Sequence, residues 1–216
     1  MNMTPGDSTI CAVVLAAGLS SRMGTQKMLL PLGGKTVVGH VVGRLLSSKV
    51  KGIYVVVGHQ GDQVAAALGG RGVTIAHNPD YAGGMLTSLR CGLKSLPHGC
   101  EAALVVLGDQ PAIRGEVVDR LIETFISMDA APSAGKRILI PCHQGRRGHP
   151  VLIPARFFPE ILTRHDAVGL RGLMQSHPDE IVELEMNDPA LLTDMDSPAD
   201  YERERINAEF AMRNAE

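Results

Sequence analysis

The residues best suited to chemistry lie in a loop of small residues near the start of the chain, within the segment ICAVVLAAGLSSRMGTQK at positions 10–27. An apolar run gives way there to residues 16–18 (AAG), whose small side chains let a ligand approach the backbone closely. Two serines follow, and Arg22 and Lys27 add two positive charges. Hydroxyl groups, backbone N–H groups and cations in one turn are typical of a site for a polyphosphate.

Two commoner phosphate-binding loops do not match this segment. The P-loop requires Gly, four residues and then Gly-Lys-Ser/Thr, whereas Gly24 stands one position late and is followed by Thr-Gln-Lys. The dinucleotide fingerprint G-x-G-x-x-G fails because position 20 is Ser. The plain structural alternative is a strand-to-helix turn with a surface Arg and Lys.

The second group of candidate residues is acidic. Asp109 follows the apolar run 103–107 and a glycine, which places it at the ligand edge of a sheet but also suits a helix cap or a turn. Asp194 and Asp196 lie two positions apart, on one side of an extended segment, and also suit the cap of a helix that begins at residues 197–198. Because a triphosphate normally arrives with Mg²⁺, which prefers carboxylate ligands, Asp109 with Asp194 or Asp196 predicts a metal site. Two such carboxylates repel each other unless a cation lies between them.

The elements that would position these residues alternate regularly along the first part of the chain. Strand-like apolar runs lie at 11–15, 53–57, 73–76, 103–107 and 138–140. Apolar residues recur at helical spacing within 37–46, 64–68, 85–96 and 117–125. This alternation predicts an α/β fold with a mostly parallel sheet that is covered by helices on both faces. Ligands of such sheets bind beyond the carboxyl ends of the strands, where the 16–27 loop is expected.

The remaining chain predicts a more irregular arrangement within the same domain. We expect short strands at 149–153 and 181–185, short helices at 155–162 and 169–176, and a charged helix at 198–213. No linker or internal repeat separates a second domain, so a single domain over 10–213 should follow a flexible N-terminus at 1–9. Residues 129–136 should form a surface loop, and the chain after Phe210 should be poorly ordered.

Composition excludes several classes of protein. With 216 residues, 44% of them hydrophobic, the chain can build one substantial core, and its net charge of −2 indicates neither a nucleic-acid nor a membrane surface. Its apolar runs are too short to span a bilayer and its first residues do not resemble a signal peptide, so we expect a cytoplasmic protein. The four cysteines lack zinc or C-x-x-C spacing and should be free thiols. Without Trp, an aromatic platform for single-stranded nucleic acid is not expected.

The loop segment resembles the signature LAAG-x-S-x-R-M-G-x-x-K of the MobA-like nucleotidyltransferases, which move a nucleoside monophosphate from a nucleoside triphosphate onto an acceptor. Five segments match in order over about residues 10–201. The resemblance implies a three-layer α/β/α Rossmann-like nucleotidyltransferase fold with a mostly parallel sheet. It implies that Arg22, Lys27 and Asp109 are catalytic. In it, GDQP corresponds to the metal-binding segment, and Asp196 to the later, metal-facing acid of D-I-D-T-P-E-D-Y.

Two further segments extend the implied site. Residues 78–89 resemble N-P-x-Y-x-x-G-M-x-x-S-L, which implies contacts to the base or ribose. The implied nucleotide-binding residues are Leu15, Ala16, Ala17, Gly18, Arg22, Lys27, Asn78, Gly84 and Ser88. Residues 147–151 resemble R-G-H-P-V of the branch that acts on molybdopterin, which implies acceptor binding by Gly148, His149 and Pro150. For His149, a hydrogen-bonded histidine before a structural proline is the alternative.

The matches are similar to the MocA-like molybdenum cofactor cytidylyltransferases within this family. The guanylyltransferase branch has LAGG where this chain has LAAG, so the resemblance implies CTP as donor, molybdopterin as acceptor, and Mg²⁺ or Mn²⁺ as cofactor. Alternatives are GTP, an acceptor such as a sugar phosphate or methylerythritol phosphate, and a non-catalytic cofactor carrier for a xanthine dehydrogenase-type hydroxylase. A molybdenum hydroxylase is the partner that this last alternative implies. The triphosphate machinery formed by Arg22, Lys27 and Asp109 weighs against the carrier.

Overall fold

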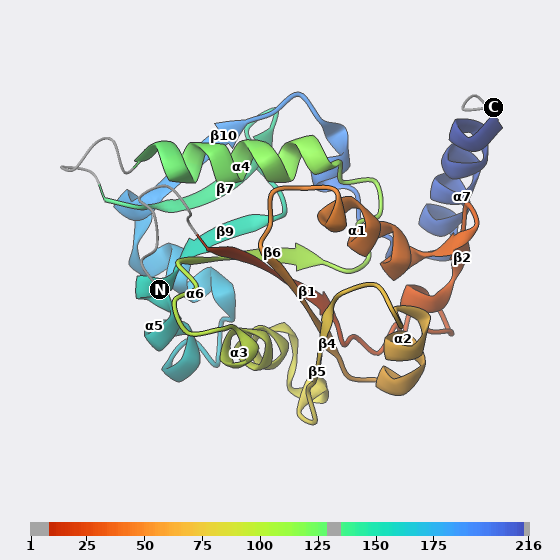
Figure 1. Cartoon of the computed structure of the whole chain (residues 1–216), viewed down its shortest axis with the longest axis horizontal. Helices are drawn as coiled ribbons and strands as arrows, with labels where there is room; N and C mark the ends of the chain where they lie inside the picture. Colours follow the sequence, from red (N-terminus) through yellow and green to blue (C-terminus); the bar gives the residue numbers. More distant parts are fainter. Residues whose placement is uncertain (1–8, 129–134, 214–216) are drawn as a thin grey trace.

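The computed structural model describes residues 9–128 and 135–213 of the chain (Figure 1). Most of the expected flexible start at 1–9, most of the expected loop at 129–136, and the last three residues lie outside the described residues. The centre is a sheet with the strand order β10-β7-β9-β6-β1-β4-β5, and β8 pairs with β7. Its strands are β1 (Ile10–Ala16), β4 (Gly52–Val57), β5 (Thr74–His77), β6 (Ala102–Leu107), β7 (Ile138–His143), β8 (Arg146–Arg147), β9 (Val151–Pro154) and β10 (Ile181–Glu185).

Helices cover both faces of the sheet, which confirms the predicted α/β class. One face packs against α1 (Val37–Leu46), α2 (Gly61–Ala67) and α4 (Gly115–Ser127), and the other against α3 (Met85–Ser95), α5 (Phe158–Thr163) and α6 (Leu170–Ser176). Successive side chains of β1 point to opposite faces of the sheet, so Val14 belongs to the core on the first face and Val13 to the core on the second. Figure 1 shows α4 and α1 above the sheet and α3 below it.

Strand pairing is parallel except around β9. The pairs β1–β4, β1–β6, β4–β5 and β7–β10 are parallel, whereas β9 is antiparallel to both β6 and β7. The predicted strand at 149–153 is thus confirmed as an element, but its direction was not predicted, because an apolar run does not encode the direction of pairing.

The ends of β1 and β6 are in register, and this sets the position of the site. Leu15 pairs with Leu107, and Gly108 continues the ladder by donating its N–H to the carbonyl of Leu15 at 3.0 Å. A Cβ at Gly108 would lie 2.9 Å from that carbonyl oxygen, so only glycine fits this close approach. Asp109 therefore emerges beside the loop that follows β1.

The sequence patterns missed a small subdomain at one side of the sheet. A hairpin of β2 (Pro31–Leu32) and β3 (Lys35–Thr36) packs near α7 (Pro198–Arg213), and Leu32, Val37 and Met195 form a separate apolar cluster there. Two-residue strands are too short to show a two-residue period. All four cysteines are free, as expected, and no helix among the described residues is long and apolar enough to cross a membrane.

Candidate active site

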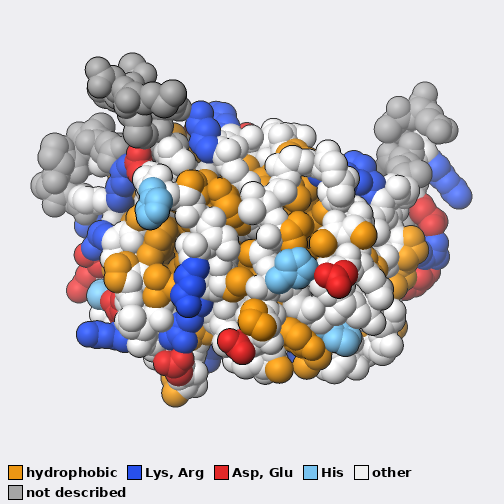
Figure 2. Space-filling view, turned by 60° about the horizontal axis from the view of Figure 1, so that its bottom comes forward, with side chains coloured by type: hydrophobic (Ala, Val, Ile, Leu, Met, Phe, Trp, Pro, Cys, Tyr) orange, Lys and Arg blue, Asp and Glu red, His pale blue; other side chains and the backbone are white. Residues whose placement is uncertain are grey.

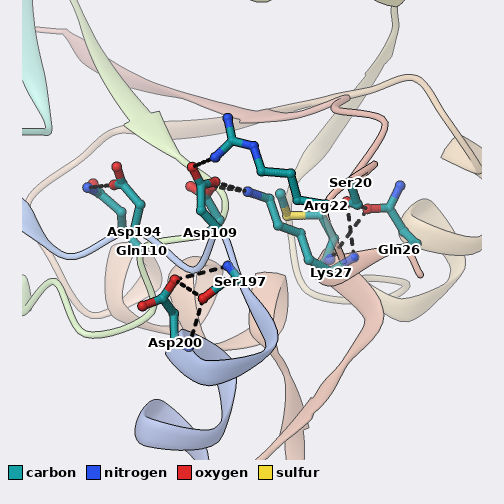
Figure 3. Close-up of polar contacts among 11 residues, drawn as sticks. Ser20, Arg22, Gln26, Lys27, Asp109, Gln110, Asp194, Ser197 and Asp200 are labelled. Carbon is teal, nitrogen blue, oxygen red and sulfur yellow. Dashed lines mark hydrogen bonds and ion pairs between the residues drawn. The ribbon is translucent and has the colours of Figure 1, made fainter. Parts of the chain in front are cut away.

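The loop after β1 is braced by Gln26, a residue that the sequence patterns did not single out. The Ser20 hydroxyl donates to Gln26 Oε1 at 2.9 Å and accepts the N–H of Lys27 at 3.1 Å (Figure 3). The buried Gln26 amide donates to the carbonyl of His59 at 2.7 Å. Gly18 is exposed, with open space where a Cβ would lie. Hydrogen bonds to Gln26 therefore hold the loop in place, while its backbone at Gly18 is open to solvent and accessible to a ligand.

Lys27 lies between two carboxylates from distant parts of the chain. It begins the 3₁₀ helix η1 (Lys27–Leu29), and its Nζ pairs with Oδ2 of Asp109 and, at 3.1 Å, with Oδ1 of Asp196. Arg22 pairs with the other oxygen of Asp196. Lys27, which the sequence assigned only to phosphate, thus lies between the two carboxylates for which the sequence predicted a divalent metal ion.

The four charged side chains of this site differ in burial: Lys27 and Asp109 are largely buried, whereas Arg22 and Asp196 lie nearer the surface. The side chains of Lys27 and Asp109 are only 12% and 14% exposed, whereas Arg22 is 74% exposed. Burial opposes the charge of Lys27, but the two carboxylates outweigh it and raise the pKa of its ammonium group. The hydrogen bond from Lys27 is the main cause of a lowered pKa of Asp196. Lys27 and Asp196 are therefore both charged at neutral pH.

The structure distinguishes the two acids near the C-terminus. Asp194 accepts a hydrogen bond from Gln110 Nε2 at 2.5 Å, so only Asp196 shares a cation with Asp109. Between them, Met195 is fully buried and its N–H donates to the carbonyl of Asp109 at 3.2 Å. This bond joins the two acidic segments along their backbones.

Neither acid caps the last helix. The cap is Ser197, and its partner is Asp200, whose carboxylate accepts from the N–H and hydroxyl of Ser197 at 2.9 and 2.6 Å. The Ser197 hydroxyl in turn accepts the N–H of Asp200 at 3.3 Å, which completes a capping box. The predicted cap at Ser197 is thus confirmed, and the capping alternative for Asp194 and Asp196 is wrong.

Two of the expected nucleotide-binding residues are buried in a hydrogen-bonded pair. Asn78 donates to the Ser88 hydroxyl at 3.0 Å and accepts the N–H of Asp80 at 3.0 Å. The pair ties the loop after β5 to α3, so both side chains support that loop. Gly84, with φ +97°, is the N-cap residue of α3, and it lines a cleft beside the start of that helix. Nucleotide binding by this segment stays a prediction.

The expected acceptor segment lines the same cleft, which has a volume of about 670 Å³. Leu15, Gly84, Gly148 and His149 all line it, whereas Pro150 is buried. A Cβ at Gly148 would lie 2.4 Å from the carbonyl oxygen of Leu191, so this glycine also has a packing role.

His149 lines the cleft, and the charges of Asp109 and Asp194 act on its imidazole. Burial lowers the pKa of its imidazole, while the negative charges of Asp194 and Asp109 partly oppose that shift. The ring is therefore neutral at pH 7, and it offers a hydrogen-bonding nitrogen rather than a charge.

The carboxylates fit a divalent cation. Asp109 and Asp196 converge on one positively charged atom, so their oxygens are close enough to share one ion. Asp196 is half exposed, which leaves room for water and phosphate oxygens. Mg²⁺ is commonly bound by one or two carboxylates with the remaining ligands from substrate phosphates and water.

Comparison with known proteins finds similarity over most of the chain. Residues 12–181 match the family described as MobA-like NTP transferase domain. The chain is 29% identical to the molybdenum cofactor cytidylyltransferase of Escherichia coli (strain K12) over 195 residues, which is 90% of this chain and 94% of that protein.

Solved structures show the same fold. A nucleotidyl transferase from Methanothermobacter thermautotroptrophicus superposes with a TM-score of 0.80 at 26% identity, covering 94% of this chain and 99% of that one. Rv0371C of Mycobacterium tuberculosis H37Rv, solved as a complex with manganese, has a TM-score of 0.70 at 24% identity and covers 92% and 99%. These matches confirm the Rossmann-like fold.

Proposed function

Since the chain belongs to the family of MobA-like NTP transferase domains and is a nucleotidyltransferase, we propose that it transfers CMP from CTP to the phosphate of molybdopterin and releases pyrophosphate. The observation that carries the proposal is the convergence of Lys27, Asp109 and Asp196 at the carboxyl ends of β1 and β6. The similarity to a molybdenum cofactor cytidylyltransferase supports the acceptor, and the AAG loop supports CTP.

The transfer needs no side-chain nucleophile. An oxygen of the acceptor phosphate forms a bond to the α-phosphorus of CTP, the bond from that phosphorus to the bridging oxygen breaks, and pyrophosphate leaves with the electron pair. An ionised phosphate also needs no general base. Catalysis is therefore positioning and charge neutralisation.

The residues of the loop and the acidic cluster divide this work. Asp109 and Asp196 would bind Mg²⁺ or Mn²⁺, which supplies positive charge at the α-phosphate. With such an ion bound, the two carboxylates would no longer require Lys27 as their counter-ion, and its ammonium group would be available to the phosphates. Arg22, exposed at the rim, reaches the outer phosphates and the departing pyrophosphate. Delivery of the product to a molybdenum hydroxylase, and the cytoplasm as location, stay predictions.

Pyrophosphate release tests the proposal directly. Purified protein is incubated with Mg²⁺, each of the four ribonucleoside triphosphates, and molybdopterin with or without molybdate. We expect CTP to exceed GTP by at least about tenfold in kcat/KM, which is ~1.4 kcal/mol of discrimination.

The alternatives give different results in the same assay. A preference for GTP would reject the assigned base but not the reaction class. Turnover with a sugar phosphate or methylerythritol phosphate instead of molybdopterin would reject the acceptor. Binding of molybdopterin without pyrophosphate release from any triphosphate would favour the carrier.

A further inference from the structure

We propose that the cleft beside His149 binds the flat ring system of the acceptor and that Arg171 binds the acceptor phosphate. The inference rests on the proposed function for the identity of the ring as a pterin. It assigns to the acceptor a cationic residue that lies outside the motifs recognised in the sequence.

The walls of the cleft are apolar. Hydrophobic side chains from several elements line it, among them Leu86 and Leu89 of α3, Val105 of β6, Ile140 of β7 and Met174 of α6. Two further lining residues, Met85 and Val168, are large hydrophobic side chains that are more than half exposed. Figure 2 shows the side of the molecule on which α3 lies, where hydrophobic side chains are scattered among polar and charged ones. An apolar cleft with exposed hydrophobic residues suits a flat heteroaromatic ring better than a sugar.

The charges that line the cleft leave one cation without a partner. Arg147 pairs with Glu183 at 2.7 Å, and Asp166 pairs with Arg90 at 2.5 Å. His149 is neutral for the reason given above. Arg171 also lines the cleft and, among residues 9–128 and 135–213, has neither an ion pair nor a side-chain hydrogen bond. The cleft therefore carries one uncompensated positive charge, which favours an anionic ligand.

The segment that carries Arg171 is held in place on both sides. Arg90 of α3 donates to the carbonyls of Ile161 and Arg164, at 2.8 and 2.6 Å, and to Asp166. Figure 1 shows α3 beside α5 and α6 on the same side of the sheet.

A second set of contacts secures the residue next to Arg171. Glu160 accepts hydrogen bonds from His165 and His177 at 2.8 and 2.7 Å when these rings present N–H groups to it. Gly172 lets His165 pack closely, since a Cβ there would lie 2.4 Å from its Nδ1. These contacts thus fix the backbone that carries Arg171, whose exposed side chain lines the cleft.

The cleft also adjoins the proposed transfer site. Leu15 lines the cleft and lies at the end of β1, directly before the phosphate loop. His149 lines it as well, and the negative charge of Asp109 acts on its imidazole, where it partly opposes the effect of burial on the pKa. The cleft therefore extends from Arg171 on α6 to the end of β1, so a ring bound in it lies next to the proposed transfer site.

Pterin fluorescence provides a binding test that is separate from catalysis. The chain has no Trp, so the emission of a pterin can be followed without interference from tryptophan. We would titrate wild type, Arg171→Gln, Arg171→Lys and Arg164→Gln with 6-hydroxymethylpterin phosphate and with unphosphorylated 6-hydroxymethylpterin. Arg164 is the matched control, because it is an exposed arginine of the same segment that does not line the cleft.

We expect removal of the phosphate to weaken binding to wild type by at least about tenfold, the loss typical of one charged contact. In Arg171→Gln the phosphate should add less than about threefold, Arg171→Lys should recover most of the difference, and Arg164→Gln should behave as wild type. An excess of glucosamine 1-phosphate should not displace the pterin phosphate.

Three results would overturn the inference: no binding of pterin phosphate to wild type, the same phosphate effect in wild type and Arg171→Gln, or displacement by the sugar phosphate. If Arg171→Gln does not fold, the inference is still tested by comparing the phosphorylated and unphosphorylated pterins in wild type and in Arg171→Lys. Failure of pyrophosphate release together with normal pterin binding would reject the proposed function and leave this site intact.

Discussion

At the residue scale, one ammonium group connects the phosphate loop with both acidic segments. Lys27 is nearly buried and pairs with Asp109 and Asp196, whereas Arg22 pairs with Asp196 at the surface. The two cations of the loop therefore contribute differently to the folded protein, although both are expected to act on phosphate.

This difference predicts separate effects of Arg22→Ala and Lys27→Ala. Both should lower kcat on the order of 10²–10³-fold, as for other transition-state donors. Only Lys27→Ala should also lower the free energy of unfolding, by about 1–3 kcal/mol, because it leaves the buried Asp109 without its cation. Arg22→Ala should change it by less than about 1 kcal/mol, since exposed ion pairs contribute little.

Urea denaturation measures the effect on the free energy of unfolding, and pyrophosphate release measures the effect on kcat. Unchanged turnover in both variants would contradict the assignment of the loop.

At the element scale, close approach of α3 to the sheet places the start of this helix at the cleft. Gly92 makes that approach possible, because a Cβ there would lie 2.3 Å from Val13 Cγ1 of β1 and 2.9 Å from Val56 Cγ2 of β4. In α1, by contrast, a Cβ at Gly43 would meet only Lys35 Nζ, at 3.7 Å.

The same substitution at these two glycines should therefore have opposite signs. Gly92→Ala should destabilise the protein by about 1–3 kcal/mol through overpacking, despite the higher helix propensity of Ala. Gly43→Ala should stabilise it by roughly 0.5–1 kcal/mol, because nothing opposes that propensity. Midpoints of urea unfolding at constant slope give both values. Stabilisation by Gly92→Ala would mean that α3 does not pack this closely on the sheet.

At the scale of the whole molecule, the site joins segments that are far apart in the chain. Lys27 lies 82 positions from Asp109 and 169 from Asp196. A ligand that binds these residues together is bound by the folded protein and not by the unfolded chain, so it shifts the unfolding equilibrium.

Mg²⁺ with CTP should therefore raise Tm. At a ligand concentration of about 100 Kd the expected stabilisation is ~2.7 kcal/mol, which for a domain of this size corresponds to roughly 5–10 °C. A chelator should remove most of the shift, and so should Asp109→Asn, which keeps the size of the side chain but removes a charge. Because Asp109 also pairs with Lys27, this variant should have a lower Tm than wild type before ligand is added. A full shift in the presence of chelator would show that nucleotide binding does not depend on the cation.

The sequence alone determined the elements and the edge at which the site lies. Strands and amphipathic helices follow from local apolar periodicity, and parallel strands place their carboxyl ends on one edge of the sheet. For this reason the loop after β1 and the acid after β6 could be brought together without coordinates. The order of motifs was sufficient to recognise the family.

Only the tertiary structure decided which side chains are partners. It pairs Asp196 rather than Asp194 with Asp109 through Lys27, buries Asn78 against Ser88, and places Gln26 beneath the loop. These pairings depend on how distant segments pack: Met195 is buried in a cluster with Leu32 of the short hairpin, and its N–H bonds to the carbonyl of Asp109, which brings the C-terminal acids to the end of β6. Local periodicity contains no information on such contacts, because they are formed only when the two cores close around the sheet.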